Sequence, residues 1–276
     1  MISIAYSPCP NDTFLFYHLV RSNDPNFLIR EELFDVENLN EFAIQGKFPV
    51  TKLSFAAYFM VMDKYILLET GSALGKGCGP LLVRKKQSSV TLATAKKVYV
   101  PGLKTTANLL LSLFSKSKYD PTPKRYDEII PSLLSDSDAV GVIIHEERFT
   151  FEERGLELIM DLGEEWERET GHLIPLGAIA IRRDIPQDTA LQFQSKLRQS
   201  LEMAYKEPQE MMDYIIENSQ NKDLKVIKSH IDLYVNQYTK NLGEEGHKAI
   251  ELLLKRAIQA GFVKSPPNLP LFLGEG

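Results

Sequence analysis

Short β-prone runs alternate with helical patterns along most of the chain, and this alternation is the feature that most constrains the fold. The first run, residues 2–6, ends at a stiff Ser-Pro-Cys-Pro segment, and a helical pattern follows at residues 13–20. The runs at residues 50–53 and 97–100 are each followed by a helical pattern as well. Such alternation is typical of α/β proteins. From residue 186 onward the spacing of apolar residues predicts helices, one of them over about residues 222–238. We expect the proline- and glycine-rich tail after Ser265 to be extended or loose.

A second αβ unit interrupts the first in the middle of the chain. We therefore predict two α/β domains, a larger discontinuous one (residues 1–87 and 175–276) and a smaller inserted one (residues 88–174). We expect the glycine-rich segment at residues 71–79 to be a hairpin between them. Ligands of such proteins bind in the interdomain cleft, at the carboxyl ends of strands and the N-termini of helices.

The composition narrows the function classes. The 276 residues are 43% hydrophobic and 25% charged, as in ordinary globular proteins. A net charge of −5, with scattered basic residues, argues against binding to nucleic acid or an anionic membrane surface. The sequence has no signal-peptide pattern and no apolar run long enough for a membrane span, so we predict a cytoplasmic protein. Its oligomeric state is left open between a monomer and a homodimer.

His145 is the leading candidate for a catalytic group. It directly follows the apolar, β-branched run 139–144, which is typical of a buried parallel strand. An imidazole at the carboxyl end of such a strand can exchange a proton near neutral pH. The alternative is a structural histidine that is hydrogen-bonded at the end of the strand. We interpret the other four histidines as surface or packing residues: His18, His172, His230 and His247.

Two strand-to-helix junctions, at residues 52–54 and 105–107, each have the pattern of an anion site. Backbone N–H groups at a helix N-terminus, together with hydroxyl groups, attract carboxylates and phosphates. Each junction can also be a plain helix cap, but two facing sites would clamp an anionic ligand. The residues predicted to bind substrate here are Lys52, Leu53, Ser54, Thr105, Thr106 and Ala107.

The segment at residues 7–13 is rigid and polar. Its two prolines fix the loop, and we predict that Asn11 and Asp12 cap the following helix and face the cleft. Cys9 has no evident base in the sequence, so we do not assign it as a nucleophile. It and Cys78 are expected to be free thiols in a reducing compartment.

Several familiar motifs are missing from the sequence. It has no phosphate-binding P-loop, no dinucleotide-binding fingerprint, no serine nucleophile elbow and no Cys/His spacing typical of a metal site. We therefore predict that the protein needs neither a metal nor an organic cofactor. We interpret the acidic stretch 164–169 as a solvated helix face; the alternative is that Trp166 within it covers an aromatic ligand.

Two stretches point to a known family. They are SPCPNDTF at residues 7–14 and IIHEERFT at residues 143–150. The chain closely resembles the 1,4-dihydroxy-6-naphthoate synthase family of the futalosine route to menaquinone, over nearly its whole length. Further matching segments are residues 35–40, 51–54, 75–81, 101–107 and 175–178. Cys78 and Asn108 depart from the residues expected in this family, and both are expected to border the pocket.

The resemblance implies a two-domain fold of the type II periplasmic-binding-protein class with an interdomain cleft. It implies a carbon–carbon lyase that acts on cyclic de-hypoxanthinyl futalosine. His145 matches the family's proposed base, and residues 52–54 and 106–107 match its substrate-contacting stretches. The base would remove a proton, and a retro-aldol-type cleavage would expel the sugar remnant as the second ring becomes aromatic. Rival readings are a chorismate dehydratase and a non-catalytic cytoplasmic protein that binds a small carboxylate.

Overall fold

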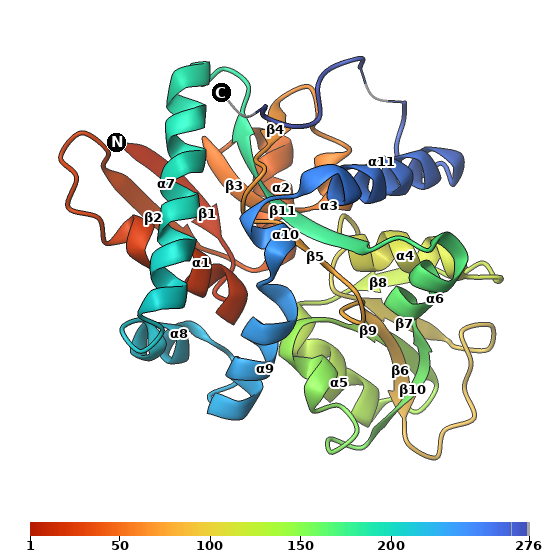
Figure 1. Cartoon of the computed structure of the whole chain (residues 1–276). Helices are drawn as coiled ribbons and strands as arrows, with labels where there is room; N and C mark the ends of the chain where they lie inside the picture. The colour runs from red at the N-terminus through yellow and green to blue at the C-terminus, as the bar shows by residue number, and fades with distance from the viewer. Residues whose placement is uncertain (266, 275–276) are drawn as a thin grey trace.

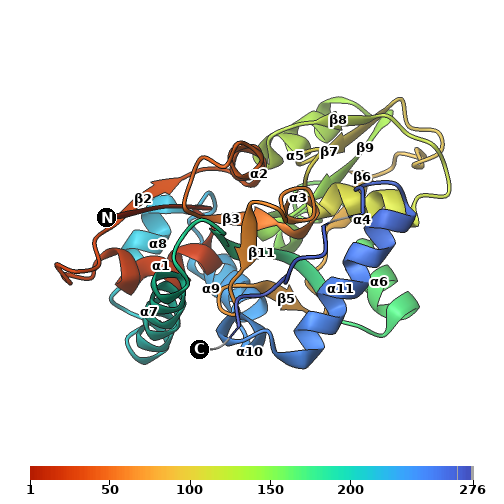
Figure 2. The same ribbon diagram turned by 90° about the horizontal axis from the view of Figure 1, so that it is seen from above.

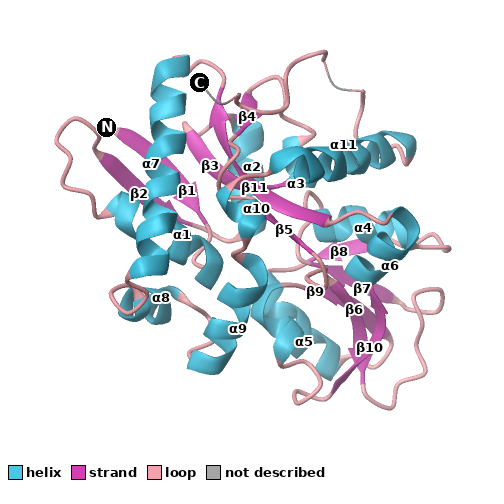
Figure 3. Cartoon of the chain, viewed as in Figure 1, coloured by secondary structure: helices cyan, strands magenta, loops and turns pink. Residues whose placement is uncertain are grey.

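The computed structural model describes residues 1–265 and 267–274, which form two α/β lobes (Figures 1 and 3). Each lobe is built on one mixed sheet. In Figure 1 the first sheet lies to the left with helices α1 and α7, and the second lies at the lower right with α5. The predicted two-domain α/β fold is therefore confirmed. In the described part of the chain, no helix has the length and apolar character that crossing a membrane requires.

The first sheet has the strand order β2-β1-β3-β11-β4, and β5 also pairs with β11. Strand β1 is parallel to β2 and β3, whereas β11 is antiparallel to β3, β4 and β5. The bounds are β1 Ile2–Tyr6, β2 Ile29–Leu33, β3 Val50–Ser54, β4 Tyr65–Leu67, β5 Ala73–Gly75 and β11 Ile174–Arg182.

The second sheet has the order β10-β6-β9-β7-β8. Its bounds are β6 Leu81–Lys85, β7 Lys97–Val100, β8 Pro121–Pro123, β9 Ala139–Ile143 and β10 Leu156–Asp161. Because β6 pairs with β9 and β10, the chain enters the second lobe before residue 81. The predicted boundary at residue 88 therefore falls after this strand instead of before it. The glycine-rich segment 71–79 is not a hairpin: it contains β5 and then crosses between the two sheets.

Helix α2 shows how local residues fix the two ends of a helix. Asp35 caps α2, as its side chain accepts hydrogen bonds from the backbone N–H groups of Glu37 and Asn38, and Gly46 ends the helix in the left-handed conformation (φ 69°). The bounds are α1 Pro10–Val20, α2 Val36–Gln45, α3 Phe55–Tyr58, α4 Thr106–Phe114, α5 Tyr126–Ser135, α6 Leu162–Thr170, α7 Gln187–Lys206, α8 Met212–Asn218, α9 Leu224–Tyr234, α10 Gln237–Lys240 and α11 Gly243–Gln259, and a 3₁₀ helix spans His145–Phe149.

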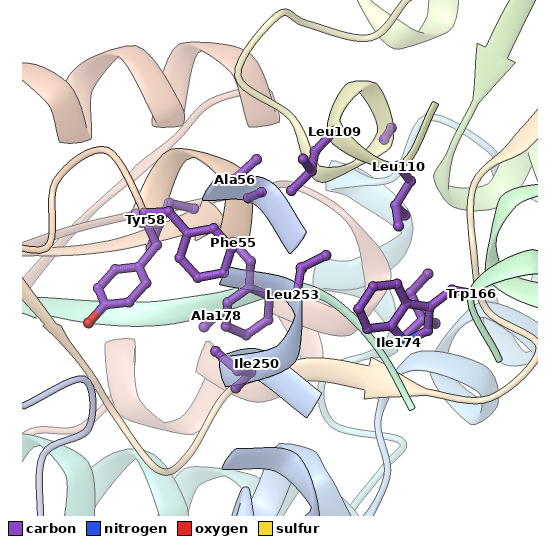
Figure 4. Packing of buried hydrophobic residues seen from close by; sticks show 14 of the residues in the cluster. Phe55, Ala56, Tyr58, Leu109, Leu110, Trp166, Ile174, Ala178, Ile250 and Leu253 are labelled. Carbon is purple, nitrogen blue, oxygen red and sulfur yellow. The ribbon is translucent and has the colours of Figure 1, made fainter. Parts of the chain in front are cut away.

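One hydrophobic cluster joins the two lobes. It contains buried residues of α3, α4, α6, β11 and α11. Figure 4 shows Phe55 of α3, Leu110 of α4, Trp166 of α6 and Leu253 of α11 in this cluster. Figure 2 shows α11 running alongside α4 and α6. The shared core therefore connects the two lobes, and Trp166 is buried in it. The alternative that Trp166 covers a ligand is therefore wrong.

Three local predictions need correction. Cys9, not Asn11 or Asp12, is the N-cap of α1, because Pro10 occupies the first helical position, where its missing N–H group costs nothing. The single helix expected near residues 222–238 is divided into α9 and α10. The tail expected to be loose after Ser265 is docked over residues 271–273, where it pairs with Leu67; residues 266 and 275–276 lie outside the described part.

Candidate active site

A cavity with about 700 Å³ of empty space lies between the two lobes. Both lobes supply its lining, which comes from the loop and first turn of α1, the β3–α3 and β7–α4 junctions, the segment after β5 and the end of β9. Every residue that the sequence singled out for substrate binding or catalysis lines it: Asn11, Asp12, Lys52, Leu53, Ser54, Thr105, Thr106, Ala107 and His145.

His145 stands at the point where β9 turns into the 3₁₀ helix. Its backbone has φ 59°, a left-handed conformation that histidine, asparagine and aspartate tolerate better than most residues. Its Nδ1 lies 3.4 Å from the sulfur of Cys9. When Nδ1–H donates to that sulfur, Nε2 carries the lone pair, and Nε2 is buried without a protein partner among the described residues.

The environment keeps the imidazole of His145 neutral. Burial, assisted by the positive charge of Lys52, lowers the pKa of His145 to about 4. Burial also raises the pKa of the Cys9 thiol well above its usual value, with a further contribution from Glu146. At neutral pH the pair is therefore a neutral imidazole beside a protonated thiol. This state allows His145 to accept a proton and makes Cys9 a poor nucleophile.

The β3–α3 junction carries a buried ion pair. Lys52 Nζ lies 2.8 Å from Asp12 Oδ1, and the two side chains are only 10% and 2% exposed. Ser54 is also engaged: its backbone N–H donates to Asn40 Oδ1 (2.9 Å), and its hydroxyl accepts from Asn40 Nδ2 (3.2 Å). Asn40 also donates to the backbone oxygen of Lys104 in the other lobe (3.3 Å). Most of the polar groups at this junction are thus paired within the protein.

The β7–α4 junction keeps free donors. Thr105 caps α4 by accepting a hydrogen bond from the backbone N–H of Asn108 (3.3 Å), and the Thr106 hydroxyl donates to the Leu176 carbonyl (2.7 Å). Within residues 1–265 and 267–274, the backbone N–H groups of Thr106 and Ala107 have no hydrogen-bond partner. They belong to the first turn of a nine-residue helix that borders the cavity. Such groups carry partial positive charge and suit a carboxylate.

His230 of α9 was predicted to be a surface or packing residue, and the structure places it in the cavity wall. Its Nε2 lies 2.9 Å from Asn11 Oδ1, and its ring stacks 6.2 Å from that of His145. The amide of Asn11 must present its NH₂ group to Asp12, which also accepts from Lys52, so its oxygen faces His230. His230 is therefore the Nε2–H tautomer, and its buried Nδ1 is an acceptor without a protein partner in the described chain.

The two residues that depart from the family pattern have different positions. Cys78 lines the cavity, and burial raises the pKa of its thiol to about 12. Asn108 does not line the cavity; its side chain donates to the Leu103 carbonyl (3.0 Å) and so stiffens the turn before α4. The expectation that both border the pocket is confirmed for Cys78 and wrong for Asn108.

A set of possible metal donors lies at the cavity wall. In the described part of the chain, one group of three such residues converges, namely Cys9, His145 and Glu146, whose donor atoms lie within 4.8 Å of one another. The sequence could not indicate this group through spacing, because position 9 is far from positions 145 and 146. A metal bound there would have to displace the proton of the thiol.

Comparison with known proteins agrees with this geometry. A family model described as menaquinone biosynthesis matches residues 2–259. The chain is 40% identical to a 1,4-dihydroxy-6-naphthoate synthase of Thermus thermophilus over 273 residues, with 99% of each protein covered. It is 37% identical to a protein of the same name from Streptomyces coelicolor, over 95% of this chain and 94% of the relative.

Solved structures support the same fold. A protein of Archaeoglobus fulgidus superimposes with a TM-score of 0.88 at 33% identity, over 95% of this chain and 98% of the other. The alkanesulfonate-binding protein of Xanthomonas axonopodis gives a TM-score of 0.73 at 12% identity, over 96% and 94% of the two chains, which shows the periplasmic-binding-protein-like fold alone. Taken together, the family model and the two sequence relatives place this chain in the menaquinone-biosynthesis family that contains the 1,4-dihydroxy-6-naphthoate synthases.

Proposed function

We propose that the protein is a carbon–carbon lyase that converts cyclic de-hypoxanthinyl futalosine into 1,4-dihydroxy-6-naphthoate in menaquinone biosynthesis, in the cytoplasm. The observation that carries this proposal is that His145 and the open N-terminus of α4 line the same cavity between the lobes. The family relationship supplies the substrate class.

The benzoate carboxylate of the substrate binds at the N-terminus of α4. There the backbone N–H groups of Thr106 and Ala107 donate to its oxygens, and the positive end of the helix dipole stabilises its charge. The ion pair of Lys52 with Asp12 forms a fixed polar wall and orients Asn11 and His230. One end of the ligand is thereby held in place, which reduces the entropic part of the barrier.

His145 is the general base in this mechanism. Its neutral imidazole takes a proton from carbon or from a hydroxyl group of the sugar remnant, and the retro-aldol-type cleavage then releases the sugar fragment. Formation of the second aromatic ring supplies much of the driving force, so the proposed steps use protein groups alone. The neutral Nδ1 of His230 is an acceptor for a hydroxyl group of the same remnant.

The test is an anaerobic assay of the purified protein with cyclic de-hypoxanthinyl futalosine, in which the naphthoate product is detected by absorbance and mass. His145→Asn is the matched variant, since asparagine tolerates the left-handed backbone at this position. General-base catalysis contributes roughly 10²–10⁴-fold, so we expect kcat to fall by that factor while substrate still binds.

Two results would contradict the proposal. Near wild-type turnover by His145→Asn would remove His145 from the role of base. Tight substrate binding without product, under conditions in which a known synthase works, would make the chain a binding protein. Dehydration of chorismate by the same preparation would favour the rival enzyme.

A further inference from the structure

Cys9, His145 and Glu146 present three donor types that bind zinc, and they come from both lobes. Cys9 caps α1 in the first lobe, whereas His145 and Glu146 begin the 3₁₀ helix after β9 in the second. Donor atoms around a tetrahedral zinc ion lie roughly 3.4–3.6 Å apart, given its usual bond lengths. The sulfur of Cys9 and Nδ1 of His145 are already 3.4 Å apart. With all three donors within 4.8 Å, only the carboxylate has to move closer.

The carboxyl group of Glu146 is a second, independent observation. Glu146 is 4% exposed, and neither of its carboxyl oxygens has a hydrogen-bond partner in the part of the chain that the structure describes. Leaving a buried polar group without a partner is costly. Its burial raises the pKa of this carboxyl group, and a cation at the convergence point would give it the partner that the protein does not supply.

A second cavity lies beside the donor group. It has about 970 Å³ of empty space, and it lies on the side of the 3₁₀ helix that faces the loop between α8 and α9. Glu146 lines this cavity, whereas His145 lines the substrate cavity, so the donor group stands between the two. Its lining includes three carboxyl-bearing residues, Asp127, Glu146 and Glu147, and two basic ones, Arg154 and Lys222.

We propose that Cys9, His145 and Glu146 bind one thiophilic divalent cation such as Zn²⁺, and that this ion prevents His145 from acting as a base. Binding replaces the thiol proton of Cys9, which leaves to solvent. Coordination of Nδ1 leaves the ring proton of His145 on Nε2, so no lone pair of the imidazole remains free. The fourth coordination position is open to water. The blocking role rests on the proposed function, whereas the ion site does not.

Cobalt titration of the chelator-treated full-length protein tests the site without any turnover assay. We expect one equivalent of Co²⁺ to produce a thiolate-to-cobalt charge-transfer band, and equilibrium dialysis to find one bound Zn²⁺. Cys78→Ser is the matched control, since it removes the other buried thiol and keeps the donor group. Cys9→Ser should abolish the band. Glu146→Gln should weaken binding at least as much as the roughly 10–100-fold that outer-shell changes cost.

The proposal is overturned if the wild-type protein shows no band, or if Cys9→Ser binds Co²⁺ as tightly as Cys78→Ser does. If Cys9→Ser fails to fold, Glu146→Gln decides instead: folded Glu146→Gln that binds Co²⁺ as tightly as the wild-type protein also overturns the proposal. In the turnover assay, the Zn²⁺ concentration that gives half-maximal inhibition should equal the midpoint of the Zn²⁺ binding curve. Binding without inhibition overturns the blocking role and supports the site alone. A protein without turnover contradicts the proposed function, and the cobalt titration still decides the site.

Discussion

The β3–α3 and β7–α4 junctions have the same sequence pattern, yet they differ in what they offer a ligand. Both place a hydroxyl residue between a buried strand and a helix, and both border the cavity. At the first, Asp12 neutralises the Lys52 ammonium, and Asn40 occupies the N–H and hydroxyl groups of Ser54. At the second, the cap and the hydroxyl of Thr106 are paired within the protein, but two first-turn N–H groups have no partner among residues 1–265 and 267–274.

This difference separates a structural junction from a binding junction. Helix α3 has four residues, too short for a strong dipole, and the backbone N–H of Ala56 already donates to the Thr106 hydroxyl (3.3 Å). Helix α4 has nine residues, and it presents its free donors to the cavity. This contrast supports the proposal that the second junction holds the substrate carboxylate, while the first organises the surrounding wall.

The largest effect expected from this comparison is on stability, at the first junction. Lys52→Met removes the cationic partner of Asp12 and leaves its buried carboxylate without a compensating charge. Breaking a buried pair in this way typically costs about 3–5 kcal/mol. We expect the free energy of unfolding, measured by denaturant titration, to fall by that amount.

The double variant Lys52→Met/Asp12→Asn is the control for this prediction. It removes both charges, so most of the lost stability should return. If Lys52→Met unfolds at the wild-type denaturant concentration, the pair does not stabilise this junction. If Lys52→Met keeps its stability and mainly raises KM, then Lys52 contacts the substrate directly, and the two junctions are equivalent.

The pH dependence of stability is a smaller effect that reports the burial of His145. Its folded pKa of about 4 lies below the unfolded value of about 6.5, so the unfolded state binds more protons between these values. The unfolding free energy that depends on the neutral imidazole is fully present above pH 6.5 and is lost as the pH falls toward 4. We expect a loss of up to about 3 kcal/mol in chelator-treated protein.

His145→Asn isolates this contribution. Burial raises the pKa values of Glu146 and Glu147, the latter to about 8, and these groups favour the folded state toward low pH instead. The difference between wild-type and His145→Asn cancels their contribution in large part. If that difference in unfolding free energy stays constant from pH 7 to pH 4, the imidazole is not held neutral by burial.

Much of the fold and of the cavity wall could be predicted from the sequence. The strands at residues 2–6 and 97–100 have the predicted bounds, and His145 does follow β9 at the cavity. These features are local, because side-chain periodicity and strand-to-helix order are written into neighbouring residues. By contrast, His230 could not be recognised, since a helical position says nothing about which distant residue it faces.

The sequence also could not predict which polar groups at the two junctions have partners within the protein. The partners of Ser54 and Lys52 come from α2 and α1, and only the tertiary fold brings them together. The same is true of Glu146, which as a charged residue would be expected at the surface and is 4% exposed. The sequence therefore does not predict which polar groups are buried, because long-range contacts decide their burial.

The smallest expected effect tests the free N–H groups of α4. Thr106→Pro removes one of them at the first helical position, where proline is well tolerated, and the extended backbone of Thr105 (ψ 151°) is compatible with a following proline. A hydrogen bond to a charged group contributes roughly 1.5 kcal/mol at the low end, so KM should rise about tenfold. Thr106→Val is the control, because it loses the hydroxyl and keeps the N–H. Equal KM values for the two variants, both folded by circular dichroism, would mean that the carboxylate binds elsewhere, and the β3–α3 junction would then become the leading candidate.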